Sequence, residues 1–165
     1  MPSAPETFTF EDDGAIPNSR LPVLLYHGVP EAADAASCER LFADNGWLGA
    51  WRNGIYPFHH FHSIAHKVLG VVSGSAGVML GGERGREFEL SRGDVVVLPA
   101  GTGHCNLRDD GLVVVGAYPD GMRWDLCRGD PGEHDDAVER IRAVPLPGSD
   151  PVAGAGGPLP ALWGG

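Results

Sequence analysis

Histidine is concentrated in one short part of the chain. Five of the seven histidines lie between positions 59 and 104, and four of them fall within the run HHFHSIAH at positions 59–66. Successive side chains of a strand point to opposite faces, so His60 and His62 share one face and His59 takes the other. Two imidazoles on one face can chelate one transition metal, with nitrogen-to-metal distances of about 2.0–2.1 Å for zinc. The pair predicts two ligands of a metal site.

A third ligand must come from a different strand, and His104 is the candidate. It follows the apolar run VVVL at 95–98 and the residues PAGTG at 99–103, a pattern typical of a strand that ends in a tight turn. His66 is a candidate fourth ligand. Neighbours on a strand face opposite ways, which argues against His66 if Lys67 faces the metal. A β-bulge after position 65 would permit it, so both arrangements stay open.

Lys67 is a candidate catalytic residue. Near a divalent ion, an inward-facing lysine is biased toward its neutral form and can serve as a base or as a substrate anchor. The alternative is a lysine whose stem follows the protein surface and whose amine reaches water. Four aromatic residues could also line a pocket, although aromatic side chains on strands belong more often to the core: Tyr56, Phe61, Tyr118 and Trp124.

The elements that carry these residues are expected to be short strands. Turn residues such as Ser73-Gly74 and Asp109-Asp110-Gly111 separate most of them. The eight predicted segments are 51–62, 67–73, 76–81, 87–90, 95–98, 104–107, 112–118 and 122–125. Eight closely spaced strands without intervening helices indicate an antiparallel sandwich or barrel.

The flanking regions are expected to add two more strands, at 8–10 and 21–28, and two helices, at 30–44 and 133–143. The tail from 144 to 165 is rich in Pro and Gly, so we expect it to be extended and held by Leu159, Leu162 and Trp163. We expect one domain over residues 1–165. Its core would lie at about 51–125, with the N-terminal strands and helix at 8–46 and the C-terminal helix and tail at 133–165.

Charge and composition indicate which classes of binding partner the protein is not expected to have. The formal net charge is −10 and no cluster of Lys and Arg is present, so we expect no nucleic-acid partner and no membrane partner. The three cysteines stand at unrelated spacings and predict neither a disulfide framework nor a cysteine-based zinc site. The N-terminal run MPSAPETFTFEDDG has neither a basic start nor an apolar stretch, so we expect a cytoplasmic location.

The spacing around the histidine pair resembles the first motif of the cupin superfamily. That motif runs Gly, five residues, His-x-His, three or four residues, Glu, six residues, Gly. This chain has Gly54, His60, His62, Lys67 and Gly74 at those spacings. The departure is Lys67, which stands at the position of the glutamate ligand. A protonated ammonium cannot coordinate a cation, so the resemblance implies a site of three histidines without the carboxylate.

The second cupin motif runs Gly, five residues, Pro-x-Gly, two residues, His, three residues, Asn. This chain has Gly93, Pro99, Gly101 and His104 at those spacings, with Arg108 at the final position. A wider stretch is similar to the small bacterial cupins of the YjlB-like group, through LPVLLYHGV, GAYPDGM and PLPGSDPVAGAGGPL. The resemblance implies an all-β jelly-roll barrel (a double-stranded β-helix) with short flanking helices, a metal at the barrel mouth and a homodimer.

Three functions are compatible with these residues. The favoured one is a non-haem, dioxygenase-like metalloenzyme acting on a small chelating molecule, because nitrogen-only sites resemble the three-histidine oxygenases among cupins. The others are a metal-dependent isomerase or lyase, and a non-catalytic cupin that binds a small molecule. The cofactor expected is one divalent transition metal, with Fe(II) favoured and Mn, Ni, Co, Cu or Zn also suited to neutral nitrogen ligands.

Overall fold

The computed structural model describes residues 3–164, which contain seven strands, three α-helices and one short 3-10 helix, η1. The strands are β1 (Glu6–Phe8), β2 (Val23–Tyr26), β3 (Trp47–Asn53), β4 (Lys67–Leu80), β5 (Arg86–Ser91), β6 (Val95–Leu98) and β7 (His104–Pro119). The helices are η1 (Pro30–Ala33), α1 (Ala35–Asp44), α2 (His134–Ala143) and α3 (Leu159–Gly164).

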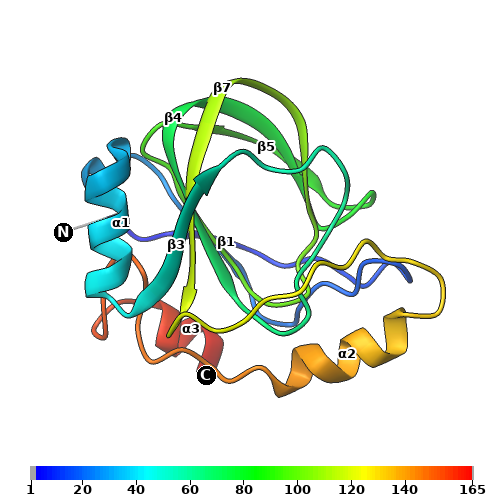
Figure 1. Cartoon of the computed structure of the whole chain (residues 1–165). Helices are drawn as coiled ribbons and strands as arrows, with labels where there is room; N and C mark the ends of the chain where they lie inside the picture. The colour runs from blue at the N-terminus through cyan, green and yellow to red at the C-terminus, as the bar shows by residue number, and fades with distance from the viewer. Residues whose placement is uncertain (1–2, 165) are drawn as a thin grey trace.

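The strands form one antiparallel sheet that curls round an interior (Figure 1). Their order is β1-β2-β6-β4-β7-β3, and β5 pairs with β4. The helices lie outside the barrel, with α1 and α2 on different sides of it (Figure 1). The predicted all-β jelly-roll barrel with short flanking helices is therefore confirmed. That residues 1–165 make up one domain stays a prediction.

Side-chain alternation along the strands produces two apolar layers. In β2, Leu24 and Tyr26 belong to an outer layer that also contains residues of α1 and α3. Val23 and Leu25 belong to the inner layer, which fills the barrel. The four valine and leucine residues of β6 divide in the same way. Both faces of these strands are buried, which explains why they read as continuous apolar runs.

β4 and β7 are each one long strand where the sequence predicted two. They pair with each other from Val68 opposite Ala117 to Leu80 opposite His104, with register shifts around Ser73 and Ser75. Gly74 adopts a φ of +70° within this ladder. Residues that looked like turns are thus absorbed as irregularities in a continuous pair of strands.

Three other predictions about elements were wrong. The strand predicted at 51–62 ends at Asn53 as β3, and in 54–62 only isolated bridges form, at His60 and Phe61. Residues 122–125 are irregular, whereas a strand was predicted there. The end of the tail is helical in α3 rather than extended, because Leu159 and Trp163 both bury their side chains in the outer layer. Trp163 Nε1 also donates a hydrogen bond to the Pro22 carbonyl at 2.8 Å. Leu162 is exposed, so only two of the three predicted apolar contacts form.

The helix predicted at 30–44 divides at Asp34. Its extended backbone ends η1, and its carboxylate accepts a hydrogen bond from the Ser37 amide as the N-cap of α1. Within residues 3–164, no helix combines the length and the apolar character needed to cross a membrane.

A buried hydrogen bond joins the tail to the barrel. The Tyr26 hydroxyl donates to Asp150 Oδ2 at 2.6 Å, and Asp150 Oδ1 accepts from the amides of Val152 and Ala153 at 2.8 and 3.0 Å. Asp150 is 0% exposed. Burial, followed by the bond to Asp150, raises the pKa of Tyr26 well above its usual range, so this tyrosine stays a donor to the carboxylate.

We expect Tyr26→Phe to lower the free energy of unfolding by about 1–3 kcal/mol, because one oxygen of a fully buried carboxylate loses its partner. Urea denaturation measures the change. Tyr56→Phe is the matched control, since the Tyr56 side chain is half-exposed and its hydroxyl bonds to nothing in residues 3–164. Equal decreases in the free energy of unfolding of the two variants would show that the buried hydrogen bond to Asp150 does not stabilise the fold.

Candidate metal centre

The two motifs meet through backbone hydrogen bonds. The His60 amide donates to the His104 carbonyl at 3.2 Å, and the His104 amide donates to the His60 carbonyl at 2.9 Å. The Gly101 amide, in the turn before β7, donates to the His62 carbonyl at 2.8 Å. Gly101 has a φ of +95°, and a Cβ there would lie 2.5 Å from the Asn18 carbonyl oxygen. The tight turn therefore requires glycine.

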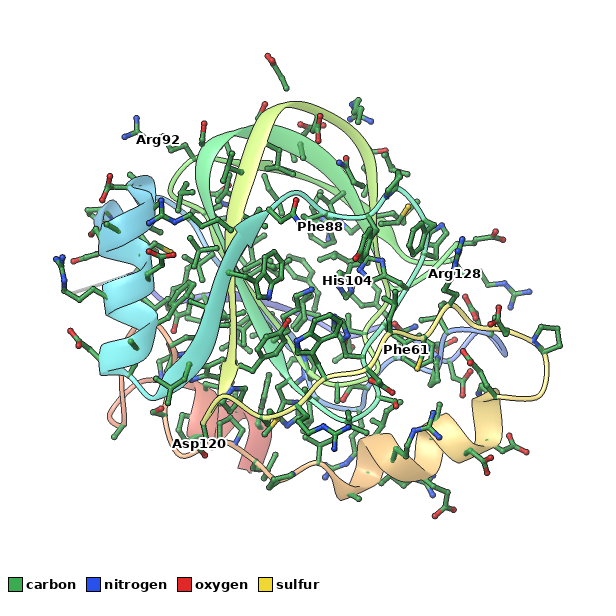
Figure 2. All side chains as sticks on the ribbon, viewed as in Figure 1. Phe61, Phe88, Arg92, His104, Asp120 and Arg128 are labelled. Carbon is green, nitrogen blue, oxygen red and sulfur yellow. The ribbon has the colours of Figure 1, made fainter. Side chains whose placement is uncertain are left out.

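This pairing gathers three imidazoles inside the barrel: His60, His62 and His104. One nitrogen from each lies within 4.8 Å of the other two. The ring centroids of His60 and His104 are 3.9 Å apart. Figure 2 shows His104 inside the barrel, with Phe61 beside the segment that follows β7. His59 lies away from this group and lines a separate hollow.

Each of these imidazoles is oriented by a backbone carbonyl. Nδ1 of His60 bonds to the Phe58 carbonyl at 2.9 Å, Nδ1 of His104 bonds to the Thr102 carbonyl at 3.0 Å, and Nδ1 of His62 bonds to the Asp125 carbonyl. A carbonyl can only accept, so Nδ1 carries the proton in all three rings. Nε2 is then left with a free lone pair, the arrangement that metal-binding histidines adopt.

Burial keeps the three rings neutral. It lowers the pKa of His60 to about 4 and, with the positive charge of Lys67, lowers the pKa of His62 to about 3. Burial also holds the pKa of His104 well below its ordinary value. His104 Nε2 is buried without a hydrogen-bond partner, a costly state that calls for a ligand. The donor set therefore fits one divalent transition metal.

Lys67 points into the same space. Its neighbours in β4 divide between the layers, Val68 outside and Leu69 inside, so alternation turns Lys67 inward. Lys67 Nζ donates to His62 Nε2 at 3.1 Å and lies 5.0 Å from the centre of the Trp51 ring. Burial lowers its pKa to about 7. The position of the missing carboxylate is thus occupied by an amine, and within residues 3–164 no aspartate or glutamate joins the histidine group.

His66 lies outside the group, on the opposite face of the sheet. Its Nδ1 accepts a hydrogen bond from the Ala100 amide at 2.9 Å, and its Nε2 donates to the Pro145 carbonyl at 3.2 Å. Its ring packs 4.8 Å from Trp163 of α3. Both ring nitrogens are therefore engaged elsewhere. His66 comes directly before β4, and the structure does not bring it to the three-histidine group.

A cavity of about 390 Å³ opens from the histidine group. Tyr56, Tyr118 and Trp124 line it as candidates from the sequence, whereas Phe61 is a core residue. Trp51 also lines it and was not foreseen. Its ring lies on Gly116, where a Cβ would come within 2.4 Å, so a glycine on the paired strand makes room for this wall.

Asp125 is a second residue that sequence reasoning missed. Its carboxylate accepts bonds from the Ser63 amide, at 2.7 Å, and from the Ser63 hydroxyl. Arg140 of α2 in turn donates to that hydroxyl at 2.8 Å. Burial raises the pKa of the Asp125 carboxyl, but the bonds from Ser63 outweigh it and lower the pKa overall. These bonds hold the Asp125 carbonyl against His62. No spacing in the sequence indicated this contact.

Comparison with known proteins identifies relatives. A sequence model described as Cupin matches residues 51–118. The uncharacterised protein YjlB of Bacillus subtilis (strain 168) is 38% identical over 160 residues, which cover 96% of each chain.

Two solved structures have a similar fold. One is an acireductone dioxygenase from Bacillus anthracis with a cadmium ion in its active centre, with a TM-score of 0.44 and 19% identity, over 62% of this chain and 80% of that chain. The other is a variant of Bacillus subtilis oxalate decarboxylase, with a TM-score of 0.39 and 19% identity, over 69% of this chain and 29% of that chain. Both are distant likenesses, and neither indicates what this chain binds.

We expect His60→Ala, His62→Ala and His104→Ala each to abolish stoichiometric metal binding, because each removes one of three nitrogen ligands. His59→Ala is the matched control and should bind as the unchanged protein does, since His59 lies outside the group. Elemental analysis of the four variants measures this, after circular dichroism has shown that each is folded. Full occupancy in His104→Ala would disprove the site.

We expect Asp125→Ala to weaken metal binding by about 10–100-fold, the usual effect of losing a group that orients a ligand. The carbonyl that holds His62 would lose its anchor at Ser63. Competition with a chelator gives the affinity. Asp136→Ala, an exposed position on α2, controls for the loss of one negative charge. A similar change in both variants would mean that long-range charge, rather than positioning, is responsible.

Proposed function

This chain belongs to the cupin family, in the YjlB-like group, and on that premise we propose that it is a metal-dependent enzyme acting on a small chelating organic molecule. The reaction proposed is dioxygenase-like and uses one divalent transition metal, with Fe(II) favoured. His60, His62 and His104 would hold the ion.

One observation carries this proposal. Three buried imidazoles have their Nδ1 protons fixed by backbone carbonyls and direct their Nε2 lone pairs into one space beside a cavity. A site with three neutral ligands leaves the charge of the ion uncompensated and leaves coordination positions open. A bound ion would supply Lewis acidity and, in the case of iron, redox chemistry to a substrate with two donor atoms.

The chain's own residues would bind and shield the substrate. Lys67 Nζ, next to His62, can donate hydrogen bonds to an oxygen of the substrate or hold a proton there. Trp51, Tyr118 and Trp124 give the cavity apolar walls that limit the access of water. The Trp51 indole N–H is satisfied by the Tyr118 hydroxyl at 2.8 Å, which leaves the hydroxyl proton for a substrate acceptor.

A metal-dependent isomerase or lyase is the second candidate. It is favoured by the position of Lys67, which places an amine where a base could take a proton from a substrate bound beside His62. A small-molecule substrate is common to both candidates. A homodimer and a cytoplasmic location, expected from the sequence, stay predictions.

Oxygen consumption tests the proposal. We expect the Fe(II)-loaded protein to consume oxygen when supplied with members of a panel of β-dicarbonyls, catechols and 2-hydroxy acids, above the rate of free Fe(II). An oxygen electrode measures the rate, and His104→Ala is the control that lacks one ligand. Metal content is determined in the same samples.

The remaining outcomes separate the alternatives. Proton exchange into a panel compound without oxygen uptake would replace the oxygenase with an isomerase or lyase. Stoichiometric metal with neither reaction would count against an enzyme and favour a binding protein. Absence of stoichiometric metal after loading with each candidate ion would refute the proposal.

A further inference from the structure

Lys67 is the only lysine in the chain, and every other basic residue apart from histidine is an arginine. Its side chain is 6% exposed. Its one hydrogen bond within residues 3–164 goes to His62, and all ion pairs found in that part of the chain use arginine or histidine instead. A buried amine without a carboxylate partner is costly. A carboxylate that enters the cavity would therefore meet a buried N–H donor that has no carboxylate partner within residues 3–164.

The cavity beside Lys67 contains no acidic side chain. Its other cation, Arg52, forms two hydrogen bonds with Glu39 at 2.9 and 2.7 Å and is compensated by it. Lys67 is thus the uncompensated cation of the cavity, in a protein whose net charge is −10. Such a local reversal of charge in a cleft with low-dielectric walls attracts anions at short range.

The walls of the cavity are flat. Tyr118 and Trp124 stack with an interplanar angle of 15° and ring centroids 6.1 Å apart. Tyr56, which also lines the cavity, stacks on Phe58 with an interplanar angle of 14° and ring centroids 4.9 Å apart. Trp124 is 48% exposed and Tyr56 is 50% exposed, so both have ring surface free for a ligand. Exposed aromatic faces favour a planar ligand over a bulky saturated one.

Other classes of ligand fit less well. A neutral sugar needs many hydrogen-bond acceptors, and the cavity offers one carboxamide, Asn53, and no carboxylate. An organic cation has no nitrogen ligands to coordinate it and would meet Lys67 in a cavity that has no acidic side chain. The volume of about 390 Å³ is near the lower end of the range for ligand pockets, which restricts the ligand to a small molecule.

We infer that this cavity binds a small planar carboxylate, aromatic or conjugated, whose carboxylate pairs with Lys67 and whose flat body lies against the aromatic walls. The inference deepens the proposed function by naming the substrate class of the same site. Only the step from ligand to substrate of a metal-dependent reaction rests on the proposed function. Lys67 is the residue that determines specificity for an anion.

The test uses metal-free protein, so that a bound ion cannot be the cause of anion binding. The probe is benzoate, with benzamide as the neutral planar control and cyclohexanecarboxylate as the non-planar anion. Calorimetry gives the affinities. We expect benzoate to bind roughly tenfold to a hundredfold more tightly than benzamide, the range for a hydrogen bond between charged groups, and more tightly than cyclohexanecarboxylate.

Chemical modification of the unchanged protein gives a second readout. Lys67 is the single lysine, so reductive methylation followed by peptide mass spectrometry reports on it without ambiguity. We expect benzoate to slow the modification of Lys67 and benzamide to leave it unchanged. Equal rates with both probes would overturn the inference, and this measurement needs no variant that might fail to fold.

Two substitutions complete the test. Lys67→Met keeps the length and the apolar stem but removes the charge, and it should lower benzoate affinity to the level of benzamide. Arg108→Met removes a cation outside the cavity that is already paired with Glu87 and Glu89, and it should leave benzoate affinity unchanged. Loss of affinity in Arg108→Met with retention in Lys67→Met would overturn the assignment.

Metal content, measured in parallel, separates this inference from the proposed function. Stoichiometric metal in a protein whose benzoate affinity does not depend on Lys67 refutes the inference and leaves the metal centre intact. Lys67-dependent benzoate binding by a protein that takes up no metal supports the inference and removes the metal centre.

Discussion

The candidate site depends on the short backbone pairing between His60 and His104. Residues 54–59 have no regular structure, so His60 cannot take its position from a continuous strand. The two hydrogen bonds between His60 and His104 attach the segment to the start of β7, and β7 is paired along its length with β4. An irregular segment thus takes its position from the two longest strands of the barrel. Ligands on separate elements can then be held with the precision that a metal site needs.

The three histidines and Lys67 form a polar cluster inside a barrel whose interior is otherwise apolar. Thirteen aliphatic residues and Phe88 fill the inner layer, and the three imidazoles with Lys67 lie beside that layer. Each Nδ1 proton is donated to a carbonyl. Among the ring nitrogens, only the Nε2 atoms can therefore be buried without a hydrogen-bond partner. His62 Nε2 is satisfied by Lys67, whereas His104 Nε2 has no partner in residues 3–164. Local costs of this kind are characteristic of functional sites, where the surrounding fold supplies the stability.

The sequence was most informative where a pattern reflects a single physical rule. Strand alternation predicted that His60 and His62 lie together, and they do, although their segment forms only isolated bridges. The same rule, applied along β4, turns Lys67 inward. Prediction of turns from local residue types failed where long-range strand pairing overrides the local preference. Gly74 is a typical turn residue but lies within β4. Residues 122–125 form no strand, and none of the strand pairs found in residues 3–164 includes them. Asp125 could not be predicted at all, because its role comes from a contact with Ser63 across 62 positions of sequence.

Replacement of the carboxylate by Lys67 would link metal binding to anion binding in the proposed site. His62 Nε2 has one lone pair, which can accept the Lys67 N–H or coordinate an ion but cannot do both. An ion at the three histidines would therefore take away the one hydrogen bond that Lys67 makes within residues 3–164. It would also add a positive charge nearby, where two unit charges 4 Å apart repel by about 4 kcal/mol at an effective dielectric constant of 20. A carboxylate in the cavity offsets both effects, because it accepts the freed N–H and neutralises charge next to the ion. Since such coupling is reciprocal, an ion would strengthen the binding of the anion by the same factor as the anion would strengthen the binding of the ion.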